Sequence, residues 1–310
     1  MKKVFAEVIA GLIPHKMTRN RWRGILRFGI FNAIKLRNDL KRNTTEPSVG
    51  LAVCAIAKDE GDYFKEWIDW HIAMGVERFY IYDNGSTDNT REILEPYIQS
   101  GVVEYIPFPG YRMQLAAYDD CLLRHRYDTR WIAFIDLDEF IVPQKNSTIP
   151  EFLREIEEAA AVEINWLIYG SSMLTEKDNR PVMERFVRHS LPSHLLNRHV
   201  KSIVNPRKVY GMIGCHEVAC IHGHATDSHG TEVRRNFKER EPQHDVIRIN
   251  HYAVKSRQEF IEKQNRGRAS GTQRTVPDEY FTKFDLNDIA DERSGMPEEV
   301  TPRKQNNGDR

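Results

Sequence analysis

Residues 53–90 read VCAIAKDEGDYFKEWIDWHIAMGVERFYIYDNGSTDNT, in which two apolar runs flank a polar loop and a helical pattern. The first run extends over residues 50–57, and residues 78–82 form the second, rich in the aromatic and β-branched side chains that favour strands. Between them, apolar side chains recur at helical spacing and stop before Gly75. The stretch therefore predicts a strand, a helix and a second strand.

The same alternation continues along the chain. Helical stripes at residues 93–98 and 113–127 alternate with strand-like runs at 102–106 and 131–135. Successive β-α units imply a parallel sheet with right-handed crossovers. We therefore expect an α/β protein with a mostly parallel sheet flanked by helices.

The second half of the chain is less regular. A helical pattern covers residues 152–160 and a strand pattern covers 164–169, after which the sequence is loop-rich and holds most of the twelve histidines. The expected organisation is a basic amphipathic arm, a single α/β domain in two halves and a disordered tail. The expected boundaries are 1–46 for the arm, 47–290 for the domain (halves 47–145 and 146–290) and 291–310 for the tail.

Composition excludes several classes of protein. The 310 residues include 40% hydrophobic residues, with 45 Lys+Arg against 45 Asp+Glu, so wholesale disorder, collagen and coiled coil are not expected. No apolar run approaches the roughly 18 to 20 residues that span a bilayer, and the N-terminus lacks a secretory signal pattern. Four sparse cysteines fit reduced thiols. We expect a cytoplasmic protein.

The zero net charge hides a basic N-terminal arm. Residues 1–46 hold 11 Lys+Arg and 3 Asp+Glu, and between His15 and Arg42 the cations interleave with apolar side chains. This mixture predicts an interfacial amphipathic helix, peripheral on the inner face of an anionic membrane. A helix packed on the domain remains the alternative. Nucleic acid is not the expected partner.

Three polar loops follow the predicted strands, at residues 57–62, 83–88 and 136–139. Ligands of open α/β sheets bind outside the carboxyl ends of the strands, so these loops converge on one crevice. No glycine-rich phosphate loop of the GxGxxG or GxxxxGK[ST] type occurs at these turns. Any phosphate must be held in another way.

Asp136 and Asp138 follow the fourth strand directly. An extended backbone would turn both carboxylates to one side, where they repel unless a cation lies between them. A hard divalent ion, Mn²⁺ or Mg²⁺, takes such oxygen ligands and keeps positions for a diphosphate. The alternative to a metal site is that the two aspartates are helix caps or solvated loop charges, as is common for a lone DxD.

Residues 53–90, together with WIAFIDLDEFIVP at 131–143, resemble bacterial glycosyltransferases of the family-2-like and family-92 groups. The similarity covers about residues 50–270, because later blocks also resemble these families: WLIYGSS (166–172), VMERFVRH (182–189), KSIVNP (201–206) and HYAVKSRQEFIEKQNRG (251–267). The resemblance implies the GT-A nucleotide-sugar fold. It also implies that Asp83 binds a uracil-type base, Asp136 the ribose or a metal-bound water, and Asp138 the metal. Three loop residues would border the nucleotide: Lys58, Asp59 and Glu60.

The histidines allow two interpretations. Cys215, His216, Cys220, His222 and His224 lie close together in sequence, but their spacing matches no standard zinc site. The resemblance instead implies that His216 or His251 approaches the diphosphate or serves as a third metal ligand. Structural histidines packed in the core are the alternative, and His71 is expected to be one. The cationic segment 251–267 could cover the diphosphate as a mobile lid.

An inverting transfer requires a carboxylate that takes the proton of the acceptor hydroxyl. Asp178, Glu184 and Glu217 follow the strand at 164–169. We favour Glu184, because strand alternation could aim it away from the apolar neighbours. A structural ion pair with Arg185 or Arg188 is the alternative.

The sequence thus predicts a metal-dependent, inverting glycosyltransferase that uses a nucleotide-sugar donor, UDP-linked, and a glycan or lipid-linked acceptor. Capsule, lipopolysaccharide or exopolysaccharide assembly is the implied process. Phosphoryl transfer by an aspartyl nucleophile is the rival chemistry, since haloacid-dehalogenase-like phosphatases also place DxD after a strand. Those enzymes carry Thr or Val where Phe140 stands here. A non-catalytic sugar-nucleotide or glycan-binding module is the second alternative.

Overall fold

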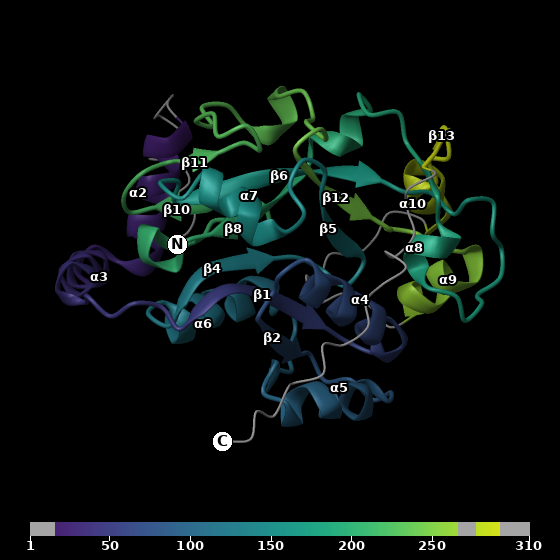
Figure 1. Cartoon of the computed structure of the whole chain (residues 1–310), viewed down its shortest axis with the longest axis horizontal. Helices are drawn as coiled ribbons and strands as arrows, with labels where there is room; N and C mark the ends of the chain where they lie inside the picture. Colours follow the sequence, from purple (N-terminus) through teal and green to yellow (C-terminus); the bar gives the residue numbers. More distant parts are fainter. Residues whose placement is uncertain (1–15, 266–276, 292–310) are drawn as a thin grey trace, which may run out of the picture.

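The computed structural model describes residues 16–265 and 277–291. Within them, one large curled sheet has the strand order β3-β2-β1-β4-β8-β6-β12-β5, with β11 paired to β6 (Figure 1). Its strands are β1 Val49–Ala57, β2 Arg78–Asp83, β3 Val103–Pro107, β4 Thr129–Phe134, β5 Glu139–Pro143, β6 Ala161–Ile168, β8 Val200–Val204, β11 Ala225–Thr226 and β12 Ile247–His251.

The first four strands are parallel, as the β-α alternation predicts. Strand β8 then runs antiparallel between β4 and β6, and β5 runs antiparallel to β12 at the edge. The helices between β1 and β6 in the chain are α4 Gly61–Ala73, α5 Thr90–Gln99, α6 Gln114–His125 and α7 Ile149–Glu155. The predicted α/β class with a mostly parallel sheet is confirmed.

Strand β1 shows why the sheet is covered on both faces. Because successive side chains of a strand point to opposite faces, Val53 packs in one apolar cluster and Cys54 in another. Helix α4 contributes Trp67 to the first cluster, and α6 contributes Tyr118 to the second. Such doubly covered strands read as continuous apolar runs. His71 of α4 is fully buried, as expected.

Two predicted helices have different bounds. Helix α7 ends at Glu155, so the expected continuation through Ala160 is wrong. Ala160 instead directly precedes strand β6, and its N–H donates to the carbonyl of His224, next to β11. The arm forms two helices, α2 Lys16–Phe28 and α3 Ile30–Arg42, broken at Gly29, which has a φ of 87° that favours glycine.

Helix α2 packs on the body of the protein, so the packed-helix alternative holds for this part of the arm. Gly24 lies against β10, where an added Cβ would approach that of Ala219 to 2.4 Å. Lys16 is buried and pairs with Glu163 at 3.1 Å and Glu217 at 2.6 Å. Helix α3 lies at the outer end of the molecule (Figure 1). None of the described helices is long and apolar enough to cross a membrane.

The second half contains short elements between loops, as expected. They are α8 Val182–Arg185, β7 Arg188–His189, η1 Leu195–Arg198, η2 Pro206–Lys208, β9 Val209–Met212, β10 Val218–Cys220, η3 Phe237–Glu239, α9 Arg257–Asn265, α10 Pro277–Phe284 and β13 Ile289–Ala290. The predicted domain boundaries stay predictions, and the expected disordered tail lies outside the described residues except for Asp291.

Candidate functional site at the carboxyl edge of the sheet

The acidic residues after β4 lie in a turn. The N–H of Glu139 donates to the carbonyl of Asp136 at 3.1 Å, and β5 begins at Glu139. The expected extended backbone is therefore wrong, because the chain must turn to pair β5 with β12. As a result, Asp136 and Asp138 have different partners.

Asp136 belongs to a cluster around a buried lysine. Lys201 of β8 donates to Asp136 Oδ2 at 2.7 Å and lies 3.3 Å from Glu139 Oε2, with 2% of its side chain exposed. Gln114 adds a hydrogen bond to Asp136 at 3.0 Å. Burial raises the pKa of Glu139 to about 8 despite the nearby ammonium. A single lysine thus contacts the side chains of both Asp136 and Glu139.

Asp138 contacts a different lysine and a histidine. Lys263 of α9 forms an ion pair with its Oδ2, and His251 Nε2 lies 3.7 Å from its Oδ1. Burial alone would raise the pKa of Asp138, but Lys263 and His251 outweigh it and hold this pKa well below its usual range. Asp138 therefore stays ionised although its side chain is largely buried.

Three side chains at this edge could hold a metal ion. Asp138, Glu139 and His251 each offer a ligand atom within 4.8 Å of the other two, the one such group found among the described residues. Glu139 Oε1 and His251 Nδ1 are buried and have no hydrogen-bond partner among those residues. Carboxylate oxygens with one imidazole suit Mn²⁺. The donor set therefore fits a divalent ion.

This cluster differs in membership from the predicted metal ligands Asp136, Asp138, His216 and His251. Asp138 and His251 come together, whereas Asp136 is paired with Lys201. His216 Nδ1 lies 2.7 Å from the carbonyl of Val200. Sequence analysis missed Glu139, although it directly follows the DxD. The roles of all these residues stay predictions.

The loops after β1 and β2 are joined by hydrogen bonds. The N–H of Asp59 donates to Ser86 Oγ at 2.9 Å, and Asp59 Oδ1 accepts from the N–H of Thr87 at 2.6 Å. Asp83 is buried and accepts from the N–H of Ser86 at 3.1 Å and from the Tyr105 hydroxyl at 2.8 Å. The predicted nucleotide loops therefore form one braced unit, bordered by half-buried Lys58 and Glu60.

The base candidates lie in other environments. Glu184 is exposed on α8, so its expected strand is wrong: the helix turn begins after Pro181, and Glu66 accepts from the N–H of Val182 at 2.6 Å. Asp178 pairs with Arg180 at 2.7 Å on the surface. Glu217 pairs with Lys16 of α2. The identity of the base stays a prediction.

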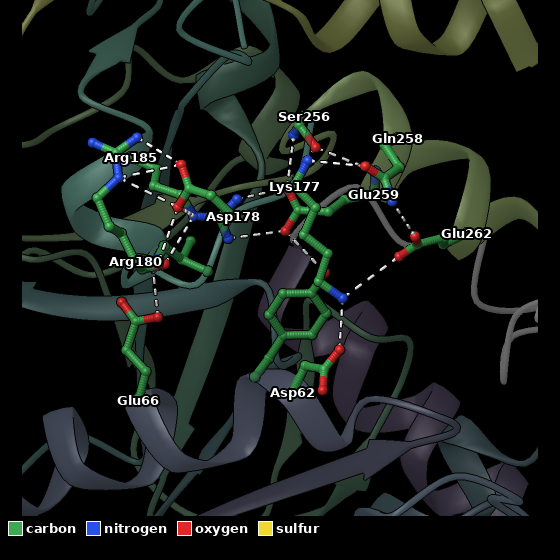
Figure 2. A network of polar contacts seen from close by, with 12 residues as sticks. Asp62, Glu66, Lys177, Asp178, Arg180, Arg185, Ser256, Gln258, Glu259 and Glu262 are labelled. Atoms are coloured by element: carbon green, nitrogen blue, oxygen red, sulfur yellow. Dashed lines mark hydrogen bonds and ion pairs between the residues drawn. The ribbon is translucent and has the colours of Figure 1, made fainter. Parts of the chain in front are cut away.

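The predicted lid segment starts at the end of β12 and continues as α9, which is anchored to the body. Figure 2 shows Glu259 at the centre of a polar network, with Arg185 on one side and Ser256 on the other. Arg185 donates to both carboxylate oxygens at 2.8 and 2.9 Å, and Ser256 Oγ donates at 2.6 Å. Next to this network, Lys255 is buried with its Nζ 4.1 Å from the Tyr63 ring centre, and burial lowers its pKa to about 8. Arg266 of the expected lid and the neighbouring Arg268 lie outside the described residues.

These features define a class of protein: an α/β protein whose candidate ligand site lies at the carboxyl ends of its parallel strands, as in many nucleotide-binding folds. A family model, glycosyltransferase family 92, matches residues 49–295. The chain belongs to glycosyltransferase family 92.

Curated relatives come from plants and an animal. A glycosyltransferase family 92 protein of Ricinus communis is 26% identical over 233 residues, which cover 71% of this chain and 39% of the relative. A galactan β-1,4-galactosyltransferase of Arabidopsis thaliana is 32% identical over 124 residues, covering 37% of this chain and 24% of the relative. A rice family 92 protein is 36% identical over 34% of this chain and 18% of the relative. The chain thus spans well under half the length of these relatives.

Similar solved structures include glycosyltransferases with bound nucleotides. Residues 1–349 of S. aureus TarS, in complex with UDP, share 14% identity and a TM-score of 0.35, over 51% of this chain and 47% of that fragment. Glucosyl-3-phosphoglycerate synthase of Mycobacterium tuberculosis, in complex with Mn²⁺ and UDP, shares 14% identity and a TM-score of 0.33, over 66% of this chain and 76% of the synthase. Likeness at these scores assigns nothing to the present site.

Proposed function

We propose that this chain transfers a sugar from a UDP-linked donor to a glycan or lipid-linked acceptor, with a divalent metal ion, Mn²⁺ or Mg²⁺, and with inversion. The observation that carries the proposal is the buried cluster of Asp138, Glu139 and His251 at the carboxyl edge of the sheet in a family 92 chain. The same proposal includes the GT-A fold and a relationship to bacterial glycosyltransferases of the family-2-like group.

The residues at the edge of the sheet would provide two positive groups for the donor diphosphate, a bound metal ion and lysine ammonium groups. Asp138, Glu139 and His251 would hold the metal ion, which supplies Lewis-acid stabilisation of the departing nucleoside diphosphate. Lys263 lies beside Asp138, and Lys255 stands nearby in a buried position. These ammonium groups can offset phosphate charge where a glycine-rich loop is lacking. Asp83, Lys58, Asp59, Glu60 and Asp136 would position the base, ribose and phosphates.

The acceptor side is proposed from the family. Relatives are named as galactan β-1,4-galactosyltransferases and as a β-1,4-galactosyltransferase of Caenorhabditis elegans, so UDP-galactose is the donor to test first. Glu184 is proposed as the general base. Capsule, lipopolysaccharide or exopolysaccharide assembly at a cytoplasmic membrane face would supply acceptors of this kind.

Calorimetric titration with UDP and UDP-galactose, with and without Mn²⁺, tests the donor site. We expect Mn²⁺-dependent binding that Asp138→Asn abolishes, because a direct metal ligand is lost. Asp245→Asn is the matched control, since Asp245 is exposed and pairs with His229 at 3.0 Å. Binding without turnover, in the presence of acceptors, would favour the glycan-binding module. A phospho-aspartate at Asp136 would favour the phosphatase chemistry.

A membrane surface is proposed as a partner because α3 exposes apolar side chains beside cations. Ile30 and Ile34 are each 53% exposed and Phe31 is 88% exposed, while Ala33 is buried. Lys41 and Arg42 follow in the last turn. Such a face can insert apolar side chains at the acyl boundary while its cations meet anionic headgroups.

A further inference from the structure

Lys263 already neutralises one of the three candidate metal ligands. Its Nζ donates to Asp138 Oδ2 and to the carbonyl of Ala253 at 3.0 Å. The two side chains are 17% and 11% exposed, so the pair is largely removed from water. A cation that binds Asp138 must therefore compete with the ammonium of Lys263.

The anchoring contacts of α9 lie at its start, one turn before Lys263. Glu259 is tied to Arg185 and Ser256, which fixes the first turn of the helix (Figure 2). Lys263 follows four residues later, on the same side of the helix, in its last turn. A lysine ammonium on a four-carbon stem can reach several positions while the helix backbone stays in place.

The acidic residues of the edge already face several lysines. Lys201 pairs with Asp136 and Glu139, Lys263 pairs with Asp138, and Lys255 is buried close to Asp138. Adding a divalent cation alone leaves an excess of positive charge in a buried place, which is costly. A diphosphate that binds together with the cation offsets this excess of positive charge.

We infer that Lys263 is an internal competitor for the metal, held on Asp138 in the free protein and transferred to the donor diphosphate when metal and nucleotide bind together. This inference rests on the proposed function and adds a positioning residue to it. Lys263 then weakens the binding of metal alone and couples it to nucleotide. By linkage, the metal strengthens nucleotide binding by the same factor.

The test is titration of Mn²⁺ into the full chain, with and without saturating UDP, followed by calorimetry or by the electron paramagnetic resonance of free Mn²⁺. We compare the natural protein with Lys263→Gln, Lys263→Arg and Lys177→Gln. Lys177 is the matched control, because it borders the same helix with 26% of its side chain exposed but pairs with Asp62 and Glu262. All four proteins are first compared for folding by circular dichroism.

Lys263→Gln is expected to bind Mn²⁺ alone about tenfold more tightly, a change of ~1.4 kcal/mol, and to gain less affinity from UDP. Lys263→Arg retains the weak binding and the coupling, and Lys177→Gln behaves as the natural protein. Equal Mn²⁺ affinity in the natural protein and Lys263→Gln would overturn the inference while leaving the metal site intact. An equal increase in Mn²⁺ affinity in Lys177→Gln would also overturn it. The loss of any nearby positive charge would then explain the tighter binding, without a specific role for Lys263. If no variant binds Mn²⁺ even with UDP, the proposed metal site itself fails.

Discussion

Arg185 and Glu259 form a bidentate ion pair inside the protein, with only 2% and 1% of their side chains exposed. The pair joins α8 to α9, two segments that are 74 residues apart in the chain. Burial alone would raise the pKa of Glu259, but hydrogen bonds from Arg185 and Ser256 lower it to about 2. The carboxylate therefore stays charged and fixes the start of the helix that carries Lys263.

Removing one partner of this pair is expected to be costly. Glu259→Gln leaves the guanidinium of Arg185 buried without its counter-ion, and the free energy of unfolding should fall by about 3 to 5 kcal/mol. Urea unfolding followed by tryptophan fluorescence measures this change. The control is Glu95→Gln in the exposed pair with Arg91, which should change stability by less than about 1 kcal/mol. Equal effects of the two substitutions would show that burial does not govern the Arg185 pair.

His71 is expected to make the protein sensitive to acid. Its Nδ1 lies 2.7 Å from the Trp67 carbonyl and its Nε2 accepts from the N–H of Ile141 at 3.3 Å, so the neutral ring satisfies both contacts. Burial lowers the pKa of His71 from 6.5 to about 4. The unfolded chain takes up the proton first, so the free energy of unfolding should fall by about 3 kcal/mol as the pH drops from 7 through 4.

Urea unfolding at pH 7, 5.5 and 4.5 measures this loss in the natural protein and in His71→Gln. The variant should be less stable at pH 7 and should lose correspondingly less on acidification. His229→Gln is the control, because a hydrogen bond to Asp245 raises the pKa of that exposed imidazole and its removal cannot lessen the acid loss. Parallel pH curves for the natural protein and His71→Gln would refute the assignment to His71.

Glu184→Gln tests the proposed base. If Glu184 takes the acceptor proton, kcat should fall by about 10²- to 10⁴-fold while donor binding is unchanged, because only the transferred proton loses its acceptor. Steady-state transfer rates with UDP-galactose, together with calorimetric donor affinity, separate the two effects. Glu176→Gln, a nearby exposed carboxylate, is the control. An unchanged kcat in Glu184→Gln would remove this residue from the mechanism.

Helix α3 is expected to bind anionic vesicles. The double substitution Phe31→Ser and Ile34→Ser should weaken sedimentation with phosphatidylglycerol vesicles by about tenfold or more, since burial of each large apolar side chain is worth roughly 1.5 to 3 kcal/mol. Binding should also weaken as salt is raised, because screening reduces the attraction of the cations. Leu123→Ser on α6, where Leu123 is 74% exposed, should leave binding unchanged. Equal sedimentation of the natural protein and the double variant would argue against this surface.

Local patterns in the sequence were sufficient to predict the first half of the fold. The strand-like runs at 50–57, 78–82 and 131–135 match β1, β2 and β4 within one or two residues, and the helical stripe between the first two runs lies in α4. The reason is physical: strands buried on both faces need continuous apolar runs, and a helix against them needs an apolar stripe. The same patterns placed Asp138 at the carboxyl edge of the sheet.

The partners of these acids were decided only by the tertiary structure. Lys201 lies 65 residues from Asp136 in sequence, and Lys263 lies 125 residues from Asp138, so no local periodicity connects them. The turn at Asp136 and the helix at Glu184 also escaped sequence analysis, because each depends on contacts with distant segments. Periodicity records which side of an element is buried, whereas the charge that neutralises a buried carboxylate depends on which distant segment folds against it.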